Sequence, residues 1–273
     1  MGETPYHNSD HATSSRPGKV SVLLRGLLTA LVLIVVWGVA VAVFQPAPFI
    51  LPGPLRVLMT LWEQAESLLY HASITLVEIV LGLILGTVLG VATALLANAF
   101  AFARRYVLPV VVASQALPVF AIAPLLVIWF GLGLGSKIAM ATLIIYFPVA
   151  SALNDGLTRA EGSLMDLARL YRASPWKTLV QFRLPAAMPS LASGLRVAAT
   201  IAPIGAIVGE WVGASGGLGY VINQANARMQ TDTVFAGLVI LVVMVVLLRS
   251  LVDFALDRLV HWAPRTSSVY SHS

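Results

Sequence analysis

Residues 166–185 read DLARLYRASPWKTLVQFRLP and hold four basic side chains against one acidic side chain. Long apolar runs lie on both sides, so the stretch is a polar segment between two hydrophobic ones. Leu167, Leu170 and Tyr171 recur at helical spacing, which predicts a short helix over residues 166–173. A basic segment in this setting is typical of a cytoplasmic loop in a membrane protein.

A second short helix is expected directly after the first. Ser174 and Pro175 form a helix-start pair, because serine caps the first turn and proline loses no hydrogen bond there. Trp176 follows on the apolar side of this helix, which is predicted to run to about residue 182. Leu184 and Pro185 are expected to end it. The loop is therefore predicted to be a projection of two helices.

The composition of the whole chain points to the lipid bilayer. Of its 273 residues 58% are hydrophobic and only 11% are charged, and the mean hydropathy is +0.87. A soluble domain has about 25% charged residues. The net charge of +5 is explained by basic cytoplasmic loops, and no basic run carries the interleaved aromatics typical of nucleic-acid binding. The absence of cysteine excludes disulfides and thiolate chemistry.

The hydrophobic pattern predicts an all-α integral membrane protein with about six transmembrane helices, since a span needs about 20 apolar residues. The first apolar run is too long for a signal peptide and has no small-residue cleavage site after it. Residues 1–19 and 263–273 are expected to be cytoplasmic tails, the first of them disordered, on either side of a transmembrane domain over 20–262 with a loop at about 158–188. The six predicted spans are 20–44, 73–97, 107–130, 138–157, 191–212 and 234–260.

Basic residues give the orientation, because they gather on the cytoplasmic side. With the N-terminus inside, three basic residues fall in outer segments, namely Arg56, Lys137 and Arg228. The inner segments hold Arg16, Lys19, Arg104, Arg105, Arg159, Arg169, Arg172, Lys177, Arg183 and Arg265. Both termini and the central loop are therefore predicted to be cytoplasmic.

Two features of the outer half bear on packing. After four prolines, an amphipathic outer segment at 54–70 is predicted to lie in the membrane interface, on the apolar residues Leu55, Leu58, Trp62, Leu68 and Leu69. In the second span, Gly82, Gly86 and Gly90 recur at four-residue spacing on one helix face. Small residues let a second helix approach closely, so this stripe predicts a packing seam, with pore lining as the alternative.

Few polar residues within the spans qualify as pathway residues. Glu78 and Glu210 are carboxylates within predicted spans, and each is expected either to line a polar pathway or to reach the interface. Gln115 is a further candidate in the third span, where Pro109, Pro118 and Pro124 predict a bent element near the pathway. The candidate pathway residues are thus Glu78, Gln115, Pro118, Pro124 and Glu210.

The sequence carries no recognisable catalytic or nucleotide-binding motif. The glycine-rich segments 131–137 and 213–220 lack the spacing and the strand–helix setting of a phosphate loop. His7 and His11 are the one pair at H-x-x-x-H spacing, and all five histidines fall in tails or near span ends, so no metal site and no cofactor are predicted. No enzymatic activity is expected.

The central stretch resembles the cytoplasmic loop of permease subunits of ATP-binding-cassette importers. That motif is Glu-Ala-Ala, three residues, Gly, nine residues, an apolar residue, any residue and Leu-Pro. Asp166, Leu167 and Ala168 match its start, Phe182 its apolar position, and Leu184-Pro185 its end. The sequence departs from the motif at two positions. Asp166 stands where the motif has glutamate, and Arg172 stands where it has glycine. The second departure puts in doubt whether the turn at residue 172 needs a positive φ.

The resemblance extends over about residues 51–257. ILPGPLRV, ALPVFAIAPLLVIWFGLGLGSKI and AIVGEWVGASGGLGYVI are similar to the alkanesulfonate, taurine and nitrate branch. NQANARMQTDTVFAGL is similar to permeases for thiamine pyrimidine precursors such as hydroxymethylpyrimidine. The implied substrate is a small heteroaromatic precursor, with an alkanesulfonate, taurine or nitrate-type anion as the alternative.

The resemblance implies a set of partners and a role for the loop. The chain is expected to form a homodimer in a bacterial inner membrane, with a cytoplasmic ATPase subunit and an extracytoplasmic solute-binding protein. The implied ATPase-coupling residues are Asp166, Leu167, Ala168, Leu170, Tyr171, Arg172, Ser174, Pro175, Leu184 and Pro185. Asp166 is expected to position the loop, whereas Leu167, Ala168, Leu170 and Tyr171 pack into a cleft of the ATPase.

Two other classes of protein account for part of the sequence. An ion-gradient-driven secondary transporter would use intramembrane carboxylates and broken helices, but it leaves the matched loop unexplained. A membrane scaffold whose basic loop binds anionic lipid explains the charges but not the prolines of the third span.

Overall fold

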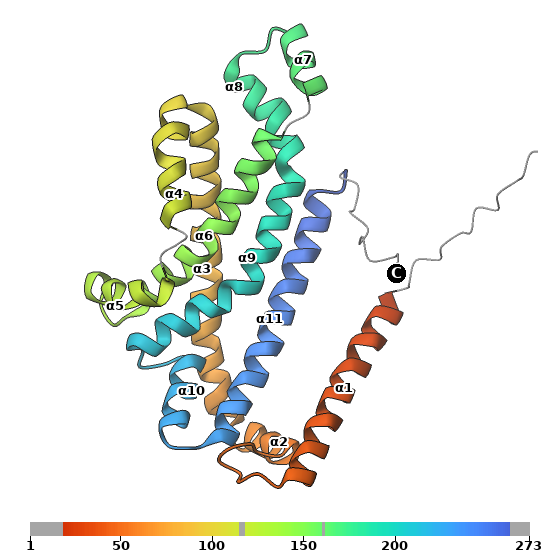
Figure 1. Cartoon of the computed structure of the whole chain (residues 1–273), viewed down its shortest axis with the longest axis vertical. Coiled ribbons are helices and arrows are strands. Elements are labelled where there is room, and N and C mark those ends of the chain that lie inside the picture. The colour runs from red at the N-terminus through yellow and green to blue at the C-terminus, as the bar shows by residue number, and fades with distance from the viewer. Residues whose placement is uncertain (1–18, 115–117, 160–161, 263–273) are drawn as a thin grey trace, which may run out of the picture.

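Helices make up every regular element in the described part of the chain, residues 19–114, 118–159 and 162–262 of a computed structural model. Figure 1 shows long helices side by side, with α7 and α8 projecting at one end and α2 and α10 lying at the other. The predicted all-α class is confirmed. In chain order the elements are α1 (Lys19–Phe44), α2 (Pro54–Glu63), α3 (Ala65–Ala99), the π-helix η1 (Ala103–Val107), α4 (Leu108–Ser114), α5 (Val119–Phe130), α6 (Leu134–Thr158), α7 (Gly162–Leu170), α8 (Pro175–Lys177), the π-helix η2 (Thr178–Arg183), α9 (Leu184–Gly213), α10 (Leu218–Ala227) and α11 (Thr231–Leu259).

Five helical segments of the described residues are long and apolar enough to cross a membrane. They correspond to the first, second, fourth, fifth and sixth predicted spans, with ends that differ by several residues. The five segments are Leu24–Phe44, Ala65–Ala99, Leu134–Thr158, Pro175–Gly213 and Thr231–Leu259.

The third predicted span, residues 107–130, is not one continuous helix, so the described residues have five long candidate spans where the sequence predicts about six. α4 ends at Ser114 and α5 begins at Val119, with Pro118 in an extended conformation between them. Proline cannot donate a helical hydrogen bond, which accounts for the break. Figure 1 shows α5 lying across the long helices, as the prediction of a bent element requires. Gln115 lies outside the described residues.

α6 is the central helix and packs between α3 and α9. A methyl group built on Gly82 would come within 2.5 Å of Ala141 Cβ, and one on Gly205 within 2.7 Å of Ala141 Cα. Gly86 meets Ile145 in the same way, at 2.7 Å. Small residues on α3 and α9 therefore let both helices approach the backbone of α6 closely.

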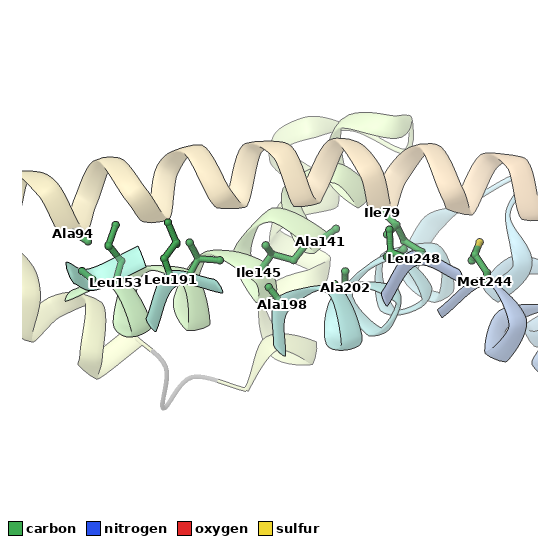
Figure 2. Close-up of a cluster of buried hydrophobic side chains, with 14 of the residues drawn as sticks. Ile79, Ala94, Ala141, Ile145, Leu153, Leu191, Ala198, Ala202, Met244 and Leu248 are labelled. Atoms are coloured by element: carbon green, nitrogen blue, oxygen red, sulfur yellow. The ribbon is translucent and has the colours of Figure 1, made fainter. Parts of the chain in front are cut away.

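The apolar core lies along this contact and extends to α11. Figure 2 shows buried side chains that come from all four helices, among them Ile79 of α3, Ile145 of α6, Ala202 of α9 and Leu248 of α11. The outward faces of the long helices are also apolar, and residues such as Val88 and Leu247 are exposed. Apolar side chains on both the inside and the outside are expected where the surrounding solvent is lipid.

The N-terminal helices lie at the edge of the bundle. Figure 1 shows α1 standing apart from the other long helices and reaching them only at its end near α2. There the ring of Trp37 stacks on that of Phe235 of α11, with centroids 5.3 Å apart. α2 exposes Leu55 and Trp62 as predicted, but Leu68 belongs to α3 and is buried, because the chain turns at Gln64.

Candidate functional site

The basic stretch forms the projection at one end of the bundle, between α6 and α9 (Figure 1). α7 packs against η2, so the two short helices form one folded unit. We call residues 162–188 the coupling loop, after the role that the family resemblance implies for it. Both predicted short helices are present in it.

The turn after α7 keeps the backbone shape of a glycine turn although it carries Arg172. Arg172 has a φ of 48°, in the left-handed region. The Ala173 N–H donates to the Ala168 carbonyl at 3.0 Å, and the Arg172 N–H donates to the Arg169 carbonyl at 2.9 Å. This pair of bonds closes a helix through a left-handed residue, most often glycine. The doubt raised by arginine at the glycine position is resolved, because the positive φ is retained.

Arg172→Gly is expected to stabilise the coupling loop by about 1 kcal/mol, because glycine adopts this φ without a Cβ clash. Hydrogen exchange of the α7 amides should slow accordingly. Arg172→Ala is the control, since it removes the same charge but keeps the unfavourable φ, and it should give no such protection. Exchange in Arg172→Gly that is as fast as in the unaltered chain would contradict the assignment.

The second short helix begins as predicted but does not end where predicted. The Ser174 hydroxyl accepts a hydrogen bond from the Lys177 N–H at 3.3 Å, and Pro175 is the first helical residue. The helix then continues through η2 into α9, so Leu184 and Pro185 do not end it. The wider π-helical turns just before Pro185 keep the chain helical where proline cannot donate.

The coupling loop exposes large apolar side chains away from the bundle. Leu170 is 80% exposed, Tyr171 72% and Trp176 63%. Three such residues on one small projection form a surface suited to contact with another protein.

Ala168 of the matched motif has another environment than expected, whereas Asp166 is exposed. Ala168 is 2% exposed, so it packs inside the coupling loop, and its predicted packing into a partner's cleft is wrong. The exposed Asp166 forms an ion pair with Arg169 at 3.1 Å, within the same helix. Asp166 remains accessible to a partner, and its present contact orders the first helix only weakly.

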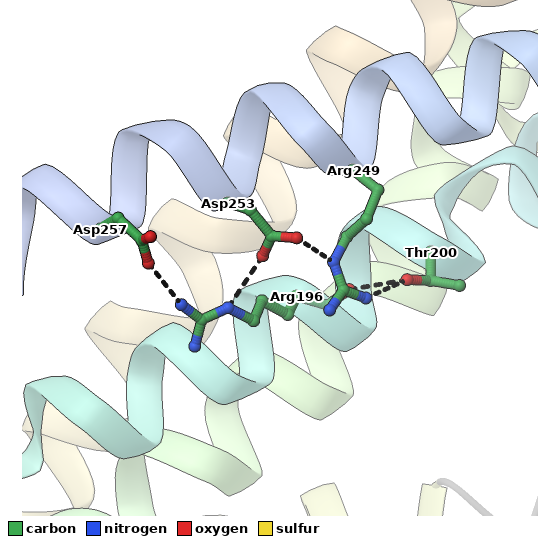
Figure 3. A network of polar contacts seen from close by, with 5 residues as sticks. All are labelled: Arg196, Thr200, Arg249, Asp253 and Asp257. Atoms are coloured by element: carbon green, nitrogen blue, oxygen red, sulfur yellow. Dashed lines mark hydrogen bonds and ion pairs between the residues drawn. The ribbon is translucent and has the colours of Figure 1, made fainter. Parts of the chain in front are cut away.

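A network of charged side chains joins α9 to α11 near the loop end of the bundle (Figure 3). Arg196 Nε donates to Asp253 Oδ1 at 2.8 Å, and its Nη2 donates to Asp257 Oδ1 at 3.3 Å. Arg249 donates to Asp253 Oδ2 at 3.0 Å and to Thr200 Oγ1 at 2.8 Å. The network holds the helix that leaves the coupling loop against the last helix. Sequence reasoning missed it, although the four-residue spacing of Arg249, Asp253 and Asp257 places them on one face of a helix.

A groove of about 400 Å³ lies between α6 and α9. For a membrane bundle its lining is polar, because Ser151, Asp155 and Ser193 contribute to it together with the ring of Phe147. None of these was predicted from the sequence as a pathway residue. The full lining is Phe147, Pro148, Ser151, Ala152, Asp155, Ser193, Gly194, Val197 and Ile201.

The two predicted intramembrane carboxylates meet at the opposite end of the bundle. Glu78 of α3 and Glu210 of α9 are 1% and 2% exposed, and their carboxyl groups contact one another. Lys137 of α6, counted as an outer-loop charge in the sequence, is buried in the same place. We call Thr75, Glu78, Lys137 and Glu210 the outer polar cluster, after the side of the membrane on which the sequence predicts this end to lie. Of the other pathway candidates, Pro118 and Pro124 are exposed at α5, and Gln115 lies outside the described residues.

The chain is similar to a large group of membrane transport proteins. The family described as "Binding-protein-dependent transport system inner membrane component" matches residues 82–263. A protein of Haemophilus influenzae named "Probable ABC transporter permease protein" is 48% identical over 87% of this chain and 97% of its own length. The formylaminopyrimidine transport permease protein ThiX of Halalkalibacterium halodurans is 36% identical over 80% of this chain and 87% of its own.

Other similarities are more distant. A protein of Bacillus subtilis named "Putative aliphatic sulfonates transport permease protein SsuC" is 31% identical over 96% of this chain and 95% of its own. Among solved structures, an inward-facing MetNI methionine ABC transporter matches with a TM-score of 0.60 at 22% identity, covering 76% of this chain and 98% of that one. At this identity the match speaks for the fold alone.

Proposed function

Because the chain belongs to the family of binding-protein-dependent transport-system inner membrane components, we propose that it imports a small organic solute and that its coupling loop docks on a cytoplasmic ATPase. The chain is a permease subunit of a binding-protein-dependent ABC transporter, which is a non-catalytic component of such a system. The observation that carries the docking proposal is the set of exposed apolar side chains on the coupling loop, Leu170, Tyr171 and Trp176.

The groove between α6 and α9 is proposed as part of the translocation path. It leads away from the coupling loop along the helix that the loop continues into, so motion of the loop acts directly on one of its walls. A second copy of this chain is proposed to complete the path on the other side. The open groove supports this view, since one copy leaves it uncovered.

The substrate is proposed to be a small heteroaromatic compound of the thiamine pyrimidine-precursor type. Asp155 in the groove disfavours a sulfonate or nitrate anion, whereas the Phe147 ring offers a stacking surface for a flat heterocycle. The permease named for formylaminopyrimidine is also more similar to this chain than the one named for aliphatic sulfonates.

Transport by the assembled system tests both parts of the proposal. The chain is reconstituted in liposomes with its ATPase and binding protein, and uptake of labelled hydroxymethylpyrimidine is measured with taurine as the matched comparison. ATP-dependent uptake of the pyrimidine is expected. Uptake of taurine alone would overturn the substrate, and uptake of any solute without ATP would overturn the coupling.

The orientation in the membrane is proposed to place the coupling loop and both termini in the cytoplasm. Since the chain has no cysteine, a single introduced cysteine reports its own accessibility. In intact cells an impermeant maleimide is expected to label Ser215→Cys, in the exposed turn before α10, and to leave Lys177→Cys unlabelled. The reverse pattern would invert the topology.

A further inference from the structure

The outer polar cluster buries two acidic side chains but only one basic side chain. Glu78 comes from α3, Lys137 from α6 and Glu210 from α9, and all three are at most 3% exposed. With every group ionised the cluster would carry two negative charges and one positive charge. An uncompensated charge in a low-dielectric interior is strongly unfavourable, so one further positive charge is required.

Lys137 supplies its charge but no donor to the glutamates. Its ammonium group donates to the backbone carbonyls of Leu132, Gly133 and Gly213, the last two at 2.8 and 3.0 Å. An ammonium group has three donors, and all three are used on the ends of α6 and α9. The carboxyl groups therefore have to satisfy one another or use other donors.

Glu210 is placed to be the ionised member of the pair. The Thr75 hydroxyl donates to Glu210 Oε1 at 2.6 Å, and the Gly219 N–H in the first turn of α10 donates to Oε2. The Thr75 oxygen accepts from the Leu218 N–H at 2.8 Å, and of the two acceptors that its hydroxyl reaches, Glu210 Oε1 is nearer than the His71 carbonyl at 3.3 Å. Both oxygens of Glu210 thus face donors, and the start of a helix favours a negative charge.

The glycines at the start of α10 make room for this carboxylate. A Cβ on Gly217 would lie 2.2 Å from Glu210 Oε1, and one on Gly219 would lie 2.7 Å from Oε2. Gly217 also has a φ of 107°, which side chains rarely adopt. α10 is therefore shaped around the Glu210 carboxylate.

Glu78 is placed to be the protonated member. Its carboxyl group is in hydrogen-bond contact with that of Glu210, yet its Oε2 atom is buried and no donor in the described part of the chain reaches it. Two carboxylates cannot form a hydrogen bond unless one of them carries a proton. The neighbouring His71, which contacts the rings of Tyr70 and Tyr220, accepts from the Gly217 N–H through Nδ1 at 3.1 Å, so that nitrogen carries no proton to give.

We propose that the outer polar cluster is a proton-binding site, in which Glu78 holds one proton and donates it to the Glu210 carboxylate while α10 is docked. If α10 moves away from α9, water reaches both carboxyl groups and the proton is released. The docked state thus binds one proton more than the undocked state. Docking must then weaken as the pH rises.

Two isosteric substitutions separate the roles of the glutamates. Glu78→Gln keeps a donor at this position and removes the titratable group, so the purified chain should stay folded. Glu210→Gln points an amide group at donors of Thr75 and Gly219, and the population with α10 docked should fall at least about tenfold. Glu66→Gln, at an exposed position of the same helix α3, is the matched control.

The measurements follow the proton and do not depend on transport. Infrared spectroscopy of the chain in lipid should show the carbonyl stretch of a buried protonated carboxyl group, absent in Glu78→Gln and present in Glu66→Gln. The thermal unfolding midpoint should fall as the pH rises above the ordinary carboxyl range of about 4, and it should respond less in Glu78→Gln. Labelling of Ala225→Cys, at a buried position of α10 that already carries a Cβ, should increase in Glu210→Gln.

Three results would overturn the proposal. The first is a carboxyl band that persists in Glu78→Gln. The second is equal behaviour of the two glutamine variants. The third is a thermal midpoint that depends on Na⁺ and not on pH, which would make the site a metal-cation site. Failure of import with any solute would overturn the proposed function and leave the infrared result unaffected, so the two proposals are judged separately.

Discussion

The double substitution Leu170→Asp and Tyr171→Asp is expected to lower ATP-driven uptake about a hundredfold or more. Both side chains are largely exposed at the tip of the coupling loop, and the docking proposal buries them against the ATPase. Two unpaired carboxylates in that contact cost roughly 3–5 kcal/mol, which disfavours the docked complex strongly. The measurement is retention of the ATPase during purification, together with uptake by the reconstituted system.

Met229→Asp is the matched control for this prediction. Met229 is as exposed as Tyr171, at 72%, but lies in the turn between α10 and α11 at the opposite end of the bundle. It should retain the ATPase fully. Equal loss of the ATPase in both variants, or normal retention in the double variant, would show that the coupling loop is not the docking surface.

Ala141→Leu is expected to reduce the yield of folded chain at least about tenfold. Ala141 lies between two glycines, with the position of a Gly82 Cβ 2.5 Å from its own Cβ and that of a Gly205 Cβ 2.7 Å from its Cα. A leucine side chain at this contact separates α6 from α3 and α9 or forces strained rotamers, at a cost of about 3 kcal/mol or more. Size-exclusion chromatography of a fluorescently tagged chain measures the folded fraction.

Ala92→Leu makes the same substitution on the exposed face of α3 and serves as the control. It adds apolar surface where lipid is expected, so the folded yield should be unchanged. A normal yield of Ala141→Leu would mean that the close approach of the three helices is not required for folding.

The helical class and the coupling loop were predictable because they depend on local signals. The length of an apolar run predicts a long helix independently of how that helix packs. Ser174-Pro175 is likewise a local signal, and it begins a helix as predicted. The prediction of the third span also rested on apolar length alone. Residues 107–130 contain enough apolar residues for a span, but the helix is broken at Pro118. The predicted end at Leu184-Pro185 failed because a π-helical segment accommodates the proline.

The outer polar cluster was only partly predictable. Glu78 and Glu210 were identified as unusual because a carboxylate in a span is costly, but each was considered alone. Their contact depends on how α3 and α9 pack around α6, which no local pattern records. Lys137 was assigned to an outer loop, because a charged residue directly before an apolar run usually lies outside the membrane. Ala168 was likewise misassigned, since its place in a motif does not reveal which way the side chain faces.

The unbroken helical run from Pro175 to Gly213 has a consequence for how movement passes along the chain. Its 39 residues extend about 58 Å, with the tip of the coupling loop at one end and Glu210 near the other. Pro189 and Pro203 lie inside α9, and proline interrupts the hydrogen-bond ladder of a helix, so the run is continuous but can bend at these two points. If the coupling loop docks on an ATPase as proposed, a movement of the loop would reach Glu210 along one continuous piece of backbone, as a bend at these prolines as well as a shift.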